Sequence, residues 1–306
     1  MQEDGVRGFI FDIERFSTAD GPGIRTVLFF KGCNLHCYWC HNPESIRTEP
    51  ELEWNPSECI GCGLCASVCP SGAHVWTPEH IILRQNCAHC FRCSEICPAQ
   101  ALKQAGKWMD VEACMAQIRP DIPFYSHSGG GVTLSGGEVL LQSAFAGKLL
   151  RKCREEGIHT AIESNLCFPQ QSLDTLLPHL NLVMADIKHT NPQKHKAGTG
   201  ASNAQVFQNL RYLDGVGMPL IIRTPVIPGY NDTPENIGET ADFLKELNNL
   251  QYYELLSYNP MGNDKRKRFG YGVPDIAVPG KQQMQKLAEI VRLRGIPVWI
   301  DGRIFA

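Results

Sequence analysis

The chain has 14 cysteines among its 306 residues, and all but three fall into tightly spaced groups. Residues 59–69 read CIGCGLCASVC, residues 87–97 read CAHCFRCSEIC, and a proline follows each of these runs. A third group, residues 33–40, reads CNLHCYWC. Thiolates are metal ligands, and a reducing compartment keeps cysteines out of disulfides. The number and spacing of the cysteines therefore predict metal chemistry.

The two longer runs share the spacing C-x2-C-x2-C-x3-C-P. This spacing is typical of two-cluster bacterial ferredoxins, in which the fourth cysteine of each run ligates the other [4Fe–4S] cluster. The crossed assignment gives one quartet made of Cys59, Cys62, Cys65 and Cys97, and a second made of Cys69, Cys87, Cys90 and Cys93. A pair of structural zinc sites is the alternative, although zinc rarely uses so tight a repeated run.

The third group has the spacing C-x3-C-x2-C, with no obvious fourth ligand. Cys33, Cys37 and Cys40 therefore predict a third [4Fe–4S] cluster with one iron open to a substrate. A zinc site completed by His36 or His41 is the alternative. The remaining cysteines are expected to be small apolar residues of the core, and they are Cys114, Cys153 and Cys167.

Composition excludes several classes of protein. With 43% hydrophobic and 20% charged residues the chain is globular, and 29 basic against 32 acidic residues disfavour a nucleic-acid partner. No apolar run approaches the ~20 residues that cross a bilayer, so no membrane partner is expected. Residues 1–7 lack the basic and apolar regions of a signal peptide. We therefore expect a cytoplasmic protein.

Short apolar strands alternate with helical patterns along most of the chain, which predicts a parallel sheet with right-handed crossovers. The expected strands are residues 26–30, 132–134, 159–163, 182–186, 219–224, 251–256 and 296–300. Between them we expect helices near 139–156, 171–179, 203–214, 234–247 and 281–294. These units are too few for a closed eight-fold barrel and predict an α/β fold, a partial (β/α)6 barrel. The ferredoxin-like segment, 49–105, is an insert that divides the barrel into residues 1–48 and 106–306.

Chemically unusual residues follow successive strands, and in such barrels the carboxyl ends of the strands carry the active site. The segments that we expect to meet at this rim are residues 33–40, 135–138, 163–165, 186–188, 223–225 and 257–259.

The cysteine octet resembles the cluster motif of the radical S-adenosylmethionine (SAM) enzymes. The flanking DGPGIRT (residues 20–26) and HNPES (residues 41–45) are similar to the glycyl radical enzyme activating enzymes. Pyruvate formate-lyase activating enzyme is the best-known relative, and it lacks a ferredoxin insert. The insert resembles the longer branch, which activates glycerol dehydratase, choline lyase and arylacetate decarboxylase types. The resemblance extends over nearly the whole chain.

This resemblance implies an anaerobic oxidoreductase activity. A reduced cluster at Cys33, Cys37 and Cys40 would cleave SAM to methionine and a 5′-deoxyadenosyl radical. That radical would abstract hydrogen from a glycine of a partner glycyl radical enzyme. The implied cofactors are three [4Fe–4S] clusters and SAM, and the implied reductant is a low-potential donor such as flavodoxin or ferredoxin. The insert clusters would relay electrons or shape the docking surface.

The resemblance also implies SAM contacts at the rim. Gly137 matches the family's SAM-contacting glycine, Asp186 and Lys188 match its Asp-x-Lys element, and Glu163 aligns with an acid near the SAM ribose. Arg223 would balance charge or form a salt bridge with Glu163 or Asp186. The full predicted SAM-binding set is Trp39, Cys40, His41, Gly136, Gly137, Glu138, Glu163, Asp186, Ile187, Lys188, Arg223 and Asn259. At Asn259 the best-known relative has a histidine, so this contact departs from the family pattern.

Two other functions remain alternatives. One is radical SAM chemistry on a small molecule or a peptide, and the other is a ferredoxin-type electron carrier with an enlarged scaffold. The weaker features are a loop with His195 and Asn203, which matches a family loop, and the basic run 265–268. We interpret the basic run as a solvated loop, with electrostatic docking of an acidic partner as the alternative.

Overall fold

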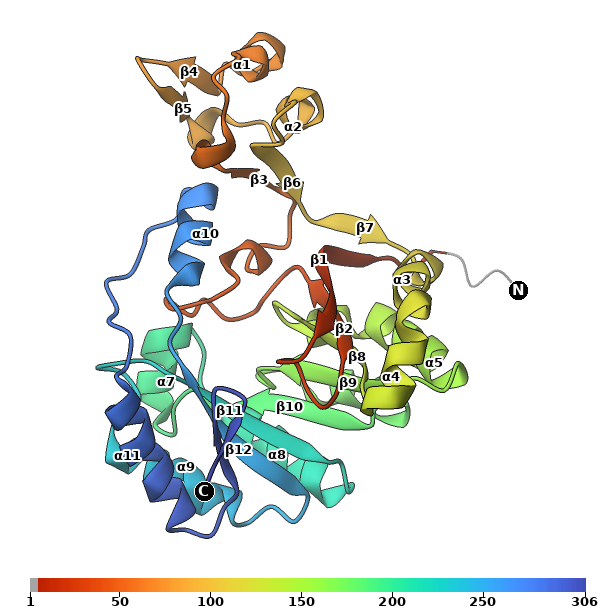
Figure 1. Cartoon of the computed structure of the whole chain (residues 1–306), viewed down its shortest axis with the longest axis vertical. Helices are drawn as coiled ribbons and strands as arrows, with labels where there is room; N and C mark the ends of the chain where they lie inside the picture. The colour runs from red at the N-terminus through yellow and green to blue at the C-terminus, as the bar shows by residue number, and fades with distance from the viewer. Residues whose placement is uncertain (1–4) are drawn as a thin grey trace.

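A computed structural model describes residues 5–306, and its centre is a ten-stranded sheet (Figure 1). Its neighbouring strands β2, β8, β9, β10, β11, β12 and β13 pair in parallel, whereas β1, β7 and β14 add antiparallel strands at the two edges. The order across the sheet is β14 (Arg303–Phe305), β13 (Val298–Ile300), β12 (Leu250–Ser257), β11 (Leu220–Val226), β10 (Leu182–Asp186), β9 (His159–Ser164), β8 (Gly131–Gly136), β2 (Arg25–Phe30), β1 (Gly8–Ser17) and β7 (Lys107–Met109).

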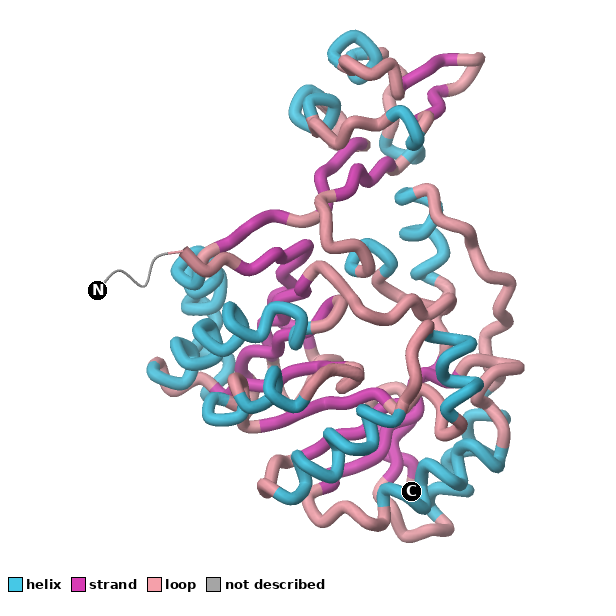
Figure 2. The backbone as a smooth tube through the Cα atoms, turned by 180° about the vertical axis from the view of Figure 1, so that it is seen from behind, coloured by secondary structure: helices cyan, strands magenta, loops and turns pink. Residues whose placement is uncertain are grey.

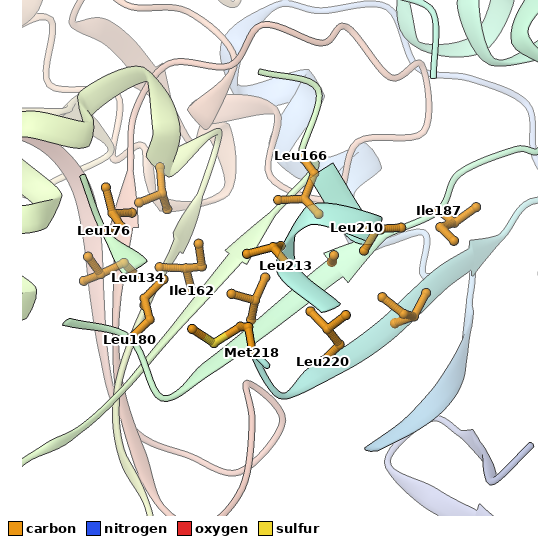
Figure 3. Packing of buried hydrophobic residues seen from close by; sticks show 14 of the residues in the cluster. Leu134, Ile162, Leu166, Leu176, Leu180, Ile187, Leu210, Leu213, Met218 and Leu220 are labelled. Atoms are coloured by element: carbon orange, nitrogen blue, oxygen red, sulfur yellow. The ribbon is translucent and has the colours of Figure 1, made fainter. Parts of the chain in front are cut away.

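Helices connect the parallel strands, and all but α10, which packs at the base of the insert, lie along the outer side of the sheet. They are α3 (Val111–Ile118), α4 (Ile122–Ser128), α5 (Ser143–Glu155), α6 (Gln170–Asp174), α7 (Pro192–Thr199), α8 (Ala204–Gly215), α9 (Pro234–Leu244), α10 (Met261–Phe269) and α11 (Lys281–Arg292). Figure 3 shows Leu210 and Leu213 of α8 packed over the strands, near Ile162 and Leu220. Burial of such leucines stabilises the outer layer by about 1.5–3 kcal/mol each.

Alternation along the strands separates this helix-covered core from the inner face. Val183 and Ala185 of β10 belong to the helix-covered core, whereas Leu182 and Met184 belong to a smaller cluster on the opposite face. Asp186 continues the inner series, because successive side chains of a strand point to opposite faces. In register, Asp186 pairs with Arg223 of β11, and Arg223 pairs with Glu254 of β12. The inner face is therefore apolar at its base and charged toward the carboxyl ends of the strands.

A small two-layer insert projects from this core, at the top of Figure 1. Its base is an antiparallel pair in which Glu51 is the partner of Ala105. Its elements are β3 (Glu51–Trp54), α1 (Leu64–Val68), β4 (His74–Trp76), β5 (His80–Ile82), α2 (Arg92–Ile96) and β6 (Leu102–Ala105). Figure 2 shows from behind that the insert stands apart from the sheet except around its base.

Ion pairs anchor the base of the insert to the core. Lys31, at the end of β2, is 2% exposed, and its Nζ lies 2.7 Å from a carboxylate oxygen of Glu51. Helix α10 contributes two further ion pairs, one between Lys265 and Glu44 with an N–O distance of 2.7 Å and one between Arg268 and Glu53 at 3.2 Å. These contacts bind β2, the loop that follows it, α10 and β3 to one another.

The predicted fold class is confirmed, since the chain is an α/β protein with a mostly parallel central sheet. All seven predicted strands form, within a few residues of their expected bounds. The basic run 265–268 was interpreted as a loop, but it lies in helix α10. Strand β1 was not predicted, and residues 1–4 of the predicted N-terminal part lie outside the described residues. No helix in residues 5–306 is both long and apolar enough to cross a membrane.

Candidate functional site

The three cysteines of the octet lie in the loop after β2, at the carboxyl end of the sheet. Backbone hydrogen bonds hold this loop, from Cys33 N to Ile46 O at 3.0 Å and from His36 N to Thr199 O at 2.8 Å. Burial raises the pKa of the Cys37 thiol, and it raises that of Cys40 to about 12. Metal coordination removes the proton from a thiol outright. Three partly buried thiols that form no disulfide are a soft donor set that suits an iron–sulfur cluster.

The glycine pair after β8 is required by the backbone of the chain itself. A Cβ at Gly137 would lie 2.1 Å from the carbonyl oxygen of Gly32, directly before the octet. Gly136 has a φ of +111°, and a Cβ there would lie 2.4 Å from the backbone of Phe30. The pair therefore brings the segment after β8 into close contact with the cysteine loop, which explains these glycines without any cofactor.

Glu138 is fully buried and accepts three hydrogen bonds from inside the protein. Its carboxylate accepts from Leu140 N at 3.0 Å, from Ser164 Oγ at 2.8 Å and from Asn165 N at 2.9 Å. Burial raises the pKa of Glu138, and these donors oppose that effect. The carboxylate thus joins the segments after β8 and β9, and its predicted contact with SAM stays a prediction.

Lys188 and Asp186 form a partly buried ion pair beside the cysteine loop. Lys188 Nζ lies 2.6 Å from a carboxylate oxygen of Asp186, and the Lys188 side chain is 10% exposed. Burial lowers the pKa of Lys188, but the negative charges of Asp186 and of ionised Cys37 and Cys33 outweigh it and raise the pKa. The fixed cation therefore lies where it favours thiolates at these cysteines.

A row of charges crosses the inner face next to this pair. Arg223 forms ion pairs with Glu163 of β9 and with Glu254 of β12, the latter at 3.0 Å. Its third nitrogen donates to Ala19 O at 2.8 Å, and Ser135 Oγ donates to Glu163 at 2.5 Å. Burial raises the pKa of Glu163, although Arg223 opposes this effect. The salt bridge between Arg223 and Glu163, one of the two roles predicted for Arg223, is therefore present.

Aromatic residues line the other side of the octet. The Trp39 ring is 6% exposed, and its centroid lies 4.7 Å from that of Tyr230. Trp39 packs with Ile227 and Tyr258 in a small cluster that includes Cys37. These contacts cover one side of Cys37.

The remaining predicted contacts differ in their surroundings. Ile187 is buried, and its N donates to Arg223 O at 3.0 Å. Asn259 is exposed, and its side chain accepts from Met261 N at 2.9 Å. The His41 ring hydrogen-bonds the Asn259 backbone, and burial lowers the pKa of His41.

Several rim residues were missed by the sequence analysis. They are Glu254, Tyr230 and Gly262, whose Cβ would lie 2.9 Å from Cys40 O. Only Glu254 carries a signal in the sequence, as a lone acid in the apolar strand QYYELL.

The insert contains two hollows, and each gathers one of the predicted cysteine quartets. The first is lined by Cys59, Cys62, Cys65 and Cys97, and the second by Cys69, Cys87, Cys90 and Cys93. The crossing arises because α1 and α2 pack against each other, so that the last cysteine of each run faces the other run. Trp54, which lines the first hollow, has a buried Nε1 with no hydrogen-bond partner among the described residues. The thiols and this free donor fit a cluster with sulfur acceptors.

Iron analysis tests the number of clusters directly. Three cubanes predict about 12 iron and 12 sulfide per chain after anaerobic reconstitution. Replacing Cys33, Cys37 and Cys40 together by alanine is expected to remove about a third of the iron. Saturation near 4 iron, or zinc in place of iron, would contradict the assignment.

Comparisons with known proteins agree with this geometry. The Radical SAM superfamily model matches residues 84–244, and the 4Fe-4S binding domain model matches residues 52–73. The chain is 43% identical to the (2S)-3-sulfopropanediol dehydratase activating enzyme of Klebsiella oxytoca over 302 residues, which covers 94% of this chain and 95% of that one. It is 42% identical to the isethionate sulfite-lyase activating enzyme of Desulfovibrio desulfuricans, with 89% of each chain covered.

Among solved structures, a radical SAM methyltransferase from Sphaerobacter thermophilus shares the fold. The TM-score is 0.55 at 15% identity, with 98% of this chain and 74% of that chain covered. The family models indicate [4Fe–4S] clusters and SAM as the cofactors. The chain belongs to the radical SAM superfamily and, within it, to the glycyl radical enzyme activating enzymes.

Proposed function

We propose that this protein activates a glycyl radical enzyme, using three [4Fe–4S] clusters and SAM. The observation that carries the proposal is the meeting of three partly buried cysteines with the Lys188–Asp186 pair at one end of the sheet. Relatives with 40–43% identity are named as activating enzymes of a dehydratase, a lyase and a decarboxylase. Their shared role, rather than any one partner, is what we transfer to this chain.

The cluster ligands are Cys33, Cys37 and Cys40. When bound there, the cluster supplies the electron that splits SAM into methionine and the 5′-deoxyadenosyl radical, which takes hydrogen from the partner's glycine. The residues of this chain hold the reactants and exclude water from them. The aromatic rings of Trp39 and Tyr230 pack beside Cys37.

We assign Lys188 as the residue that binds the carboxylate of SAM. Its ammonium is already held near Cys37 by Asp186, so it needs no large movement to accept a second anion. Asp186 in turn offers an acceptor for an ammonium or hydroxyl group of SAM. Glu163 and Arg223 lie on the same inner face, where we assign them to the ribose and to charge balance.

The other assigned SAM contacts surround these charges. They are Cys40, His41, Gly136, Gly137, Glu138, Ile187 and Asn259. In the insert, the two cysteine quartets hold the second and third clusters. The role that we assign to these clusters is to pass electrons from a flavodoxin or ferredoxin to the cluster at the octet. The natural setting that we propose is the cytoplasm.

Mixing the protein anaerobically with its partner, SAM and a reductant is expected to produce a glycyl radical. Electron paramagnetic resonance should show its doublet, because one α-hydrogen remains coupled to the unpaired electron. Deuterium placed on that glycine should appear in 5′-deoxyadenosine, since the same hydrogen atom is transferred. Mass spectrometry measures this label.

A partner in which the radical glycine is replaced by alanine is the matched control. It should bind but give neither the doublet nor labelled 5′-deoxyadenosine. If the label stays in the partner while a small metabolite or a peptide is converted, the activating role is wrong and radical SAM chemistry on another substrate replaces it.

A further inference from the structure

Two histidines lie between the two hollows of the insert. His74 lines the hollow of Cys69, and His80 lines the hollow of Cys59. Both residues are buried, with 6% and 7% of their surface exposed. Their rings meet edge to edge, with Nδ1 of His74 2.9 Å from Nε2 of His80. The proposed function assigns no role to this pair.

His80 faces the sulfur atoms of the first quartet with both ring nitrogens. Nδ1 lies 4.0 Å from Cys59 Sγ, and Nε2 lies 3.7 Å from Cys65 Sγ. The ring is clamped by Trp76, which stacks at 4.8 Å with an interplanar angle of 14°, and by Trp54, whose ring lies edge-on at 4.9 Å. Rotation of the imidazole away from the sulfur atoms would break this stack.

The contact between the two rings restricts where their hydrogens lie. A nitrogen–nitrogen distance of 2.9 Å requires one donor and one acceptor. If His80 carries its hydrogen on Nδ1, that N–H points toward Cys59, and Nε2 accepts from His74. In the opposite arrangement, the lone pair of His80 Nδ1 faces the sulfur of Cys59. A ligating thiolate is electron-rich, so Cys59 favours the first arrangement. In that arrangement the Nε2 lone pair, which also lies near Cys65 Sγ, is occupied by the hydrogen from His74, so no free lone pair faces a sulfur atom.

We propose that His80, held in this tautomer by His74, donates a hydrogen bond to the Cys59 sulfur and raises the reduction potential of the first insert cluster. Reduction adds negative charge that spreads onto the sulfur atoms, so a donor there stabilises the reduced state. The inference rests on the proposed cluster ligands. His80 is thus a potential-setting residue.

The test is a redox titration of the reconstituted full-length protein, followed by electron paramagnetic resonance. His80→Phe keeps an aromatic ring against Trp76 but removes both nitrogens. We expect the midpoint of one cluster to fall, so that its reduced-to-oxidised ratio at a fixed potential drops about tenfold, roughly 59 mV for a one-electron couple. The other two midpoints stay in place. His80→Gln retains an N–H donor and should lie closer to the wild type.

His127→Phe is the matched control. His127 is an exposed residue of helix α4, outside the insert, so the same change there should leave all three midpoints unchanged. If His80→Phe does not retain its iron, His74→Leu carries the test, since it removes the nitrogen that fixes the tautomer while His80 stays in place, and a smaller fall in the midpoint of the first insert cluster is expected. Unchanged midpoints in variants with full iron would overturn the proposal. Zinc at Cys59 and Cys65, or a wild-type chain with a single cluster, would instead overturn the proposed ligands on which the inference rests.

Discussion

Replacing Cys37 by alanine is expected to reduce SAM cleavage to the rate seen without enzyme. The three octet cysteines supply every protein ligand that we assign to the site cluster, and two thiolates do not hold a cubane with one open iron. Cys37 packs against the aromatic cluster around Trp39, which fixes its position in the loop. Formation of 5′-deoxyadenosine with dithionite as reductant measures the effect, and iron content should fall by about a third.

Cys167→Ala is the control for this variant. Cys167 also lies at the rim, where its Sγ donates to Ser202 O at 3.4 Å, but it belongs to none of the three cysteine groups. Its replacement should leave iron content and cleavage near wild-type values. Equal cleavage in the wild type and in Cys37→Ala would show that the octet does not hold the catalytic cluster.

Arg223→Met is expected to cost about 3 kcal/mol of unfolding free energy, because it leaves the buried carboxylate of Glu254 and the partly buried carboxylate of Glu163 without their counter-charge. The Arg223 side chain is 9% exposed, and it separates Glu163 from Glu254, whose side chain is 5% exposed. Methionine fills similar space but supplies no charge. Anaerobic denaturant titration of the reconstituted protein measures the loss.

The loss should also depend on pH. Burial already holds the pKa of Glu163 above its usual value, and removal of Arg223 raises it further. The folded variant then retains a proton that the unfolded chain has released, so its stability falls as pH rises. The difference from the wild type should therefore be larger near pH 8 than near pH 5.

Arg211→Met makes the same chemical change at the surface. Arg211 and its partner Glu246 are each 56% exposed, so their ion pair is worth less than about 1 kcal/mol. A comparable loss in both variants would mean that the charge row on the inner face is not an energetically coupled unit.

Cysteine spacing predicted the local groups at the site because short loops leave few arrangements of their thiols. The crossed quartets could be assigned in the same way, and each quartet lines one hollow of the insert. Strand predictions succeeded for the parallel strands because their apolar runs are continuous, as in Leu182 to Ala185.

Other features depend on tertiary contacts that local sequence does not encode. Helix α10 has no apolar stripe and forms where Lys265 and Arg268 meet acidic residues of distant segments. The requirement for glycine at 137 comes from the carbonyl of Gly32, more than a hundred residues earlier. Glu254 was predictable in principle, since an acid in a buried strand needs a partner.

The pairing of Glu51 with Ala105 means that the ferredoxin segment enters and leaves the core at nearly the same point. Paired residues lie about 5 Å apart, so excision of the whole segment would leave ends that a short turn can join. Such a deletion would nevertheless remove the carboxylate of Glu51 from the buried ammonium of Lys31 and leave it the carbonyl of Glu44 as a hydrogen-bond acceptor. Over evolutionary time, gain or loss of the segment should therefore be accompanied by exchange of Lys31 for a neutral residue. A single buried lysine would then distinguish chains that carry the insert from chains that lack it.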